Sequence, residues 1–78
     1  MEVDPPTYTL ALVSPGPNRL ELLRLIRELR PELGPAQAKA LVDGGRCVVL
    51  REVGHFELDR IRRKFERTGA DIEVARND

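Results

Sequence analysis

Proline and glycine residues cut this chain of 78 residues into short segments. They stand at Pro5-Pro6, Ser14-Pro15-Gly16-Pro17, Pro31, Gly34-Pro35, Gly44-Gly45, Gly54 and Gly69. Because proline ends a helix or a central strand and glycine favours turns, each segment between these positions has room for only one helix or strand. The chain is therefore expected to form one small domain, to whose core every element contributes.

The spacing of apolar residues distinguishes strands from helices in these segments. In the first segment Tyr8, Leu10 and Leu12 share one face, and this period of two is typical of a strand. The same criteria predict strands at residues 7–13, 46–53 and 70–74 and helices at residues 19–30, 35–43 and 55–68. The predicted order is β-α-α-β-α-β in a compact α/β (α+β) fold. The expected organisation is an extended lead at residues 1–6, a domain at 7–75 and a tail at 76–78.

One face of each element is predicted to be buried. On a helical wheel, the apolar residues of segment 19–30 gather within about 100° of arc. The residues expected to form a core together are Leu12, Leu22, Ile26, Leu41, Val49, Ile61, Phe65 and Ile72. A single cluster built from all six elements would then hold the fold together.

Composition excludes several kinds of chain. Thirteen Lys and Arg balance thirteen Asp and Glu, and 41% of the residues are apolar. This is the profile of a soluble globular domain, and it differs from that of a disordered tail or a basic coat for nucleic acid. No apolar run approaches the roughly 20 residues of a membrane-spanning helix, and the N-terminus does not resemble a signal peptide. We therefore expect a cytoplasmic protein without a membrane partner.

The residues that usually carry chemistry are few and isolated. Cys47 is the only cysteine and His55 the only histidine, which excludes an internal disulfide and a zinc site with several cysteines. No helper residue stands at a recognisable spacing for a Cys47–His55 nucleophile, and no glycine belongs to a phosphate-binding motif. We expect no catalysis, no cofactor, no metal and no small-molecule substrate.

The predicted first helix has an unusual outer face. Opposite its apolar stripe, the wheel places Leu20, Leu23, Arg19, Arg24, Arg27 and Arg30. Both glutamates of the helix lie to one flank, so we expect the leucines and the arginines beside them to be exposed. Leucine and arginine on one solvent face are typical of a docking surface for a partner with an acidic rim and an apolar centre. A solvated face with incidental leucines is the alternative.

Three blocks of the sequence, taken in order, carry a family pattern. In the first, a strand at residues 8–12 precedes Gly-Pro-Asn-Arg and an apolar and basic helix that ends at Arg27. The second, residues 33–43, reads Leu-Gly-Pro-Ala-Gln-Ala-Lys-Ala-Leu-Val-Asp. The third begins at Val49 and ends in Thr-Gly-Ala-Asp-Ile-Glu-Val. Together they resemble the C-terminal domain of the bacterial ribosomal large-subunit stalk protein (the L-seven/L-twelve family), over nearly the whole chain.

The resemblance implies a sheet of three antiparallel strands with the three helices packed on one side. In the family this domain recruits translational GTPases, the elongation factors among them, to the ribosome. The first helix makes the contact there, through basic and aliphatic residues. The matching positions are Arg19, Leu20, Leu23, Arg24 and Arg27, and in the second helix Lys39. We therefore expect a protein-binding domain of the translation apparatus whose partners are these factors.

Three departures accompany the match. Ala36 stands where the family has the first lysine of its second-helix motif, so one positive contact is absent. The loop between Arg27 and Lys39 is one residue longer and contains Pro31 and Pro35. The family protein also has an N-terminal dimerisation segment and a flexible hinge, to which nothing in this sequence corresponds. The expected form is a stand-alone domain, which acts without a tether of its own, or a piece of a stalk protein.

Two other functions are weighed against this one. The small fold is also similar to that of adaptors for Clp-type proteases, but their Asn-Asp-Asp turn is replaced here by Ser14-Pro15-Gly16-Pro17. The predicted third helix carries a basic stripe that can follow the phosphates of RNA, at Arg60, Arg63, Lys64 and Arg67. Because aromatic residues make up only 4% of the chain, base-stacking platforms are expected to be missing and nucleic acid is the less expected partner.

Overall fold

The computed structural model describes residues 5–77. Its elements are β1 (Thr7–Ser14), α1 (Arg19–Leu29), α2 (Pro35–Asp43), β2 (Cys47–Gly54), α3 (His55–Arg67) and β3 (Asp71–Asn77). The predicted order β-α-α-β-α-β and the α+β class are confirmed, and most boundaries agree within one residue. Residues 1–4 of the expected lead and residue 78 of the expected tail lie outside the described part of the chain.

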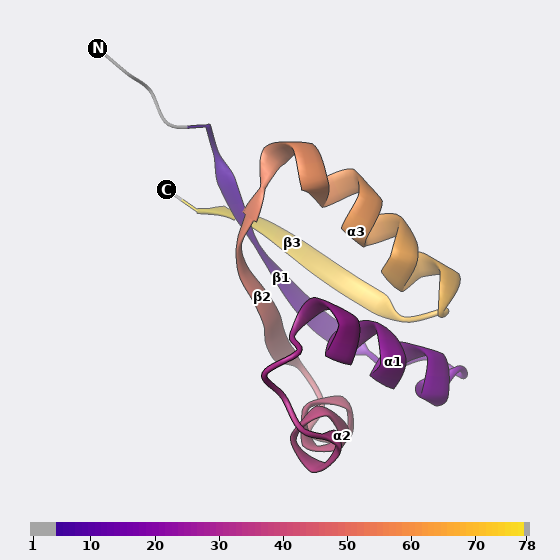
Figure 1. Ribbon diagram of the computed structural model, residues 1–78. Coiled ribbons are helices and arrows are strands. Elements are labelled where there is room, and N and C mark those ends of the chain that lie inside the picture. The colour runs from indigo at the N-terminus through magenta and orange to yellow at the C-terminus, as the bar shows by residue number, and fades with distance from the viewer. Residues whose placement is uncertain (1–4, 78) are drawn as a thin grey trace.

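The three strands form an antiparallel sheet in the order β2-β1-β3, with β1 in the centre (Figure 1). Leu10 pairs with Leu50 of β2 and Val74 of β3, so apolar side chains of all three strands share one face. The helices lie on this side of the sheet, with α2 beside α1 near the end where β2 begins (Figure 1). This is the arrangement that the family resemblance implies.

The last strand is longer than predicted, because it continues to Asn77. The Asn77 side chain accepts a hydrogen bond from the Thr9 hydroxyl at 2.6 Å and donates one to the Thr7 hydroxyl at 3.1 Å. These bonds extend the pairing of β1 and β3 to the end of the sheet. The apolar alternation stops at Val74, so the sequence pattern carried no sign of the extension.

One cluster of buried apolar side chains joins the sheet to the helices. Six of the residues predicted to form it are buried: Leu12, Leu22, Ile26, Val49, Ile61 and Phe65. Leu41 and Ile72 are only half-buried, contrary to prediction, although both pack against the cluster. Leu41 belongs to α2, which lies at the end of the sheet, and Ile72 belongs to an edge strand.

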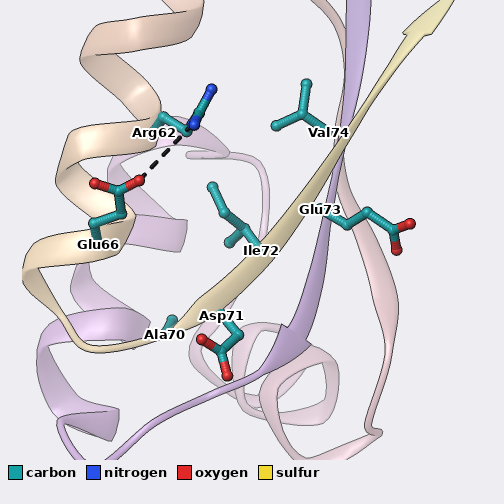
Figure 2. A pocket seen from close by; sticks show the side chains of 7 residues that line it. All are labelled: Arg62, Glu66, Ala70, Asp71, Ile72, Glu73 and Val74. Carbon is teal, nitrogen blue, oxygen red and sulfur yellow. Dashed lines mark ion pairs between the residues drawn. The ribbon is translucent and has the colours of Figure 1, made fainter.

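A depression of about 460 Å³ between α3 and β3 explains the exposure of Ile72. Figure 2 shows Ile72 and Val74 pointing toward α3, whereas Glu73 points away from it. Because α3 covers the edge strand only in part, these two apolar side chains stay accessible along the depression.

The turns before α1 and after α3 pack against each other. Gly16 (φ +71°) and Gly69 (φ +82°) both have the left-handed backbone conformation that favours glycine. A Cβ atom on Gly16 would overlap the carbonyl group of Gly69, so no side chain fits there. One end of α1 is thereby fixed against one end of α3.

Candidate protein-binding face

Helix α1 lies between the other two helices and is held to both (Figure 1). Arg19 forms an ion pair with Asp43 of α2 at 2.9 Å, and Glu28 forms one with Lys64 of α3 at 3.3 Å. The residues that α1 buries are Leu22, Leu25 and Ile26. Only the arc of α1 that faces away from the sheet is therefore open to a partner.

One of the two leucines predicted on this arc is largely exposed. Leu20 has 73% of its surface exposed. Leu23 is half-buried and packs against the core cluster, which corrects the expectation of two exposed leucines. It stands one helical turn after Arg19, on the flank of α1 from which Arg19 reaches α2. The packing of α2 against α1 takes Leu23 away from the outer face.

Arg30 also departs from its predicted place. It is the first residue past α1, with φ −129° and ψ 74°, so the helical wheel does not apply to it. Its guanidinium donates a hydrogen bond to the Val49 carbonyl oxygen at 3.2 Å and pairs with Glu32 at 2.8 Å. A backbone hydrogen bond at Glu32 and, after it, the bond from Arg30 lower the pKa of the Glu32 carboxyl. Arg30 thus ties the end of α1 to β2 and is not part of the outer face.

The remaining cations differ in their partners. Arg24 pairs with Glu21 at 3.3 Å within α1, whereas Arg27 forms no ion pair with another residue in the range 5–77. The same holds for Lys39, which stands one turn before Asp43 on the flank of α2 that reaches α1. Exposed ion pairs contribute at most about 1 kcal/mol, so a partner with carboxylates can open the Arg24 pair at little cost. We call Leu20, Arg24, Arg27 and Lys39 the α1 face.

The residues that could carry covalent chemistry are far apart. Cys47 begins β2 and His55 follows its end, so about 25 Å of extended strand separates them. The Cys47 thiol donates to the Leu41 carbonyl oxygen at 3.3 Å, and burial raises the pKa of this thiol. Within residues 5–77, no three His, Cys, Asp or Glu side chains gather as a metal-binding group. No helix in this part of the chain has the length and apolar character needed to cross a membrane.

The depression between α3 and β3 combines a polar rim with an apolar floor. Its polar rim holds the ion pair between Arg62 and Glu66, 3.8 Å apart (Figure 2), and its floor is Ile72 and Val74. The side chains that line it include no Cys, Ser, His or Tyr. The exposed aromatic side chain of α3 and the basic side chains near it lie on the side of the helix that faces away from this depression.

Phe56, the second residue of α3, was missed in the sequence and is 90% exposed. A signal for it was present, because Phe56, Arg60, Arg63 and Arg67 recur at i, i+4, i+7 and i+11. That spacing places an aromatic ring and three guanidinium groups on one face of a helix. The expectation that the chain has no exposed aromatic platform is therefore wrong.

The family model for the ribosomal protein L7/L12 C-terminal domain matches residues 8–75. Among curated relatives, the large ribosomal subunit protein bL12 of Koribacter versatilis is 36% identical over 67 residues, which are 86% of this chain and 52% of the relative. The proteins of the same name from Hyphomonas neptunium and Aquifex aeolicus are each 33% identical, over 86% of this chain and 54% and 52% of their own. The chain spans about half the length of the curated relatives it matches.

Proposed function

This chain belongs to the ribosomal protein L7/L12 C-terminal domain family, and we propose that it is a non-catalytic domain that docks translational GTPases, elongation factors among them, through the α1 face. The observation that carries the proposal is the exposed Leu20 beside Arg24 and Arg27, on a helix whose opposite side is buried. The same helix makes the contact in the family that the sequence resembles.

The two kinds of side chain on the α1 face serve different steps of binding. Arg27 and Lys39 attract an acidic partner over a distance, which raises the association rate and makes it sensitive to salt. Leu20 loses apolar contact with water only once the partner is seated, so it lengthens the residence time. Arg24 contributes less than Arg27, because its pair with Glu21 has to open first.

We expect this binding to be weak. A short helix with one exposed leucine buries far less than the roughly 800 Å² per partner of a standard stable interface. Ala36 leaves a neutral position on α2, where the family has a lysine. The dissociation constant is therefore expected to be about micromolar or weaker.

The test is an NMR titration of the isotope-labelled domain with a purified elongation factor. Chemical shifts should change at residues 19–27 and around Lys39. Arg27→Glu should weaken binding about tenfold and reduce its dependence on salt. Leu20→Ser should weaken binding through faster dissociation, while the salt dependence stays as it is.

Arg60→Glu provides the matched control, because it reverses the same charge on an exposed position of α3. Binding of the factor should be unchanged in this variant. Shift changes centred on α3, or none at about 1 mM factor, would contradict the proposal.

A further inference from the structure

An exposed aromatic ring stands at the start of α3. Of the three Tyr and Phe side chains of the sequence, Phe65 is fully buried, Tyr8 is half-buried and Phe56 is 90% exposed. The His55 ring meets the Phe56 ring edge to face, with centroids 5.4 Å apart, and lies 6.3 Å from the Tyr8 ring. Phe56 is thus supported by a neighbouring ring, and most of its surface stays accessible.

Three arginines continue the line that Phe56 begins. Arg60, Arg63 and Arg67 follow it within an arc of about 60° and extend over about 16 Å along the helix axis. This arc lies opposite the buried stripe of α3, so all four side chains face away from the core. We call these four residues the α3 face.

The arginines of the α3 face are free to meet a ligand. They form no ion pair with any residue of the described range 5–77. The cations on the flanks of the same helix are engaged, because Arg62 pairs with Glu66 at 3.8 Å and Lys64 with Glu28 at 3.3 Å. The positive charge of α3 is therefore concentrated along one line.

An open hollow of about 430 Å³ runs along this line. It is lined by Phe56, Asp59, Arg60, Arg63, Lys64 and Arg67. Of residues 5–77, Asp59 alone contributes a carboxylate to the lining, and Glu57 and Glu66 lie on the flanks of the helix. Positive groups outnumber the acid four to one in the hollow, so it favours an anionic ligand.

The chemistry of the ligand follows from the two kinds of group. Evenly spaced guanidinium groups suit a repeating anion, and an exposed ring beside them offers a surface on which a base can stack. Among residues 5–77 no aliphatic side chain lines the hollow, whereas an apolar protein segment would need one. Bases are accessible for stacking in single strands and are covered in a duplex.

We propose that the α3 face binds single-stranded RNA, with Phe56 stacked on a base and with Arg60, Arg63 and Arg67 at successive phosphates. The choice of RNA over DNA rests on the proposed ribosomal role. The contact itself is independent of the α1 face. Because the chain has no net charge, binding is weak, with a dissociation constant of about 100 μM at moderate salt.

The test measures fluorescence anisotropy of a labelled ten-nucleotide oligoadenylate with the whole chain, at several salt concentrations. Three phosphate contacts predict a slope of about −2 for the logarithm of the binding constant against that of the salt concentration. Arg63→Gln should reduce this slope by about 0.7. Phe56→Ala should weaken binding about tenfold without changing the slope, and Phe56→Trp should bind at least as well as the original chain.

Arg27→Gln is the matched control, because it removes an exposed arginine of α1 that has no ion-pair partner among residues 5–77. Arg24 would be a poor control, since it lines the same groove between α1 and α3 as Arg67. The proposal is overturned if no binding is seen at about 1 mM protein, or if Phe56→Ala binds like the original chain. It is equally overturned if Arg27→Gln loses as much affinity as Arg63→Gln, or if polyglutamate binds the α3 face more tightly than the RNA. The assay contains no GTPase, so its outcome does not depend on the function of the α1 face.

Discussion

The outer faces of α1 and α3 are built from the same cation but differ in its neighbours. On α1, Arg24 is paired with a glutamate and the apolar group beside it is the aliphatic Leu20. On α3, the outward arginines are unpaired within residues 5–77 and the apolar group is the ring of Phe56. A count of basic residues would treat the two helices alike. The neighbouring side chains make one face suited to a protein and the other to a nucleic acid.

A groove lined by paired charges lies between the two faces. A groove of about 300 Å³ runs between α1 and α3, with Glu21 and Glu28 in its lining. The pair between Glu28 and Lys64 bridges the groove. Arg24, Lys64 and Arg67 line the same groove, and Arg24 pairs with Glu21, so the border between the two faces consists largely of paired charges.

The largest expected effect is the difference in stability between variants of the two phenylalanines of α3. Phe65→Ala removes a fully buried ring from the centre of the core and should lower the free energy of unfolding by about 3–5 kcal/mol. Phe56→Ala removes an exposed ring and should change it by less than about 0.5 kcal/mol. Both values can be measured by urea denaturation. If Phe56→Ala lowers the free energy of unfolding by several kcal/mol, the ring stabilises the fold. This result would contradict its proposed role as a surface for stacking a base.

A smaller effect separates the two leucines of α1. Leu23→Ser should cost about 1–2 kcal/mol of unfolding free energy, because Leu23 packs against the core, whereas Leu20→Ser should cost under about 0.5 kcal/mol. Thermal melting of the two variants measures the difference. Equal melting temperatures would mean that Leu23 faces solvent, and the α1 face would then contain both leucines.

The smallest effect concerns Glu32 and tests whether Arg30 is turned away from the α1 face. Because the pKa of Glu32 is lowered in the fold, its ionised form adds stability at pH values above the ordinary pKa that this carboxyl has in the unfolded chain. That contribution is lost as the pH falls through the lower pKa of the folded state. In Arg30→Gln the pKa of Glu32 should rise only part of the way, since the backbone hydrogen bond is the larger cause. NMR titration of the carboxyl group measures this. If Glu32 has the same pKa in Arg30→Gln as in the original chain, Arg30 does not bond to Glu32, and it would then lie on the outer face of α1.

The parts of the structure that depend on periodicity were predictable. The order of elements follows from the Pro and Gly breaks, and the helical spacing of Leu22 and Ile26, and of Ile61 and Phe65, identified the buried sides of two helices. The same spacing contained Phe56 in line with the arginines. An aromatic content of 4%, taken over the whole chain, gives little weight to this exposed ring.

The positions of Leu23, Arg30 and the side chains of β2 depend on contacts with other elements, and the sequence of one element alone does not reveal these contacts. A helical wheel gives the direction of Leu23 but not the presence of α2 on that side. The wheel also assumes that Arg30 is helical, although the helix ends one residue earlier. In β2 the alternation fails, because two register shifts against β1 and the left-handed Glu52 (φ +56°) interrupt the pleat.

The central position of β1 has a consequence for how the chain is made. The first strand of this domain pairs with its last strand, and the Thr9 hydroxyl bonds to a side chain 68 positions further along. Such distant pairing is slow to form, because the entropy cost of closing a long loop comes before any stabilising contact between the strands. While β3 is still inside the ribosome, β1 lacks one neighbour, and Leu10 and Leu12 lack part of their cover. The domain is therefore expected to fold in one step once β3 has emerged from the ribosome, and nascent chains in which β3 is still enclosed should be sensitive to proteases.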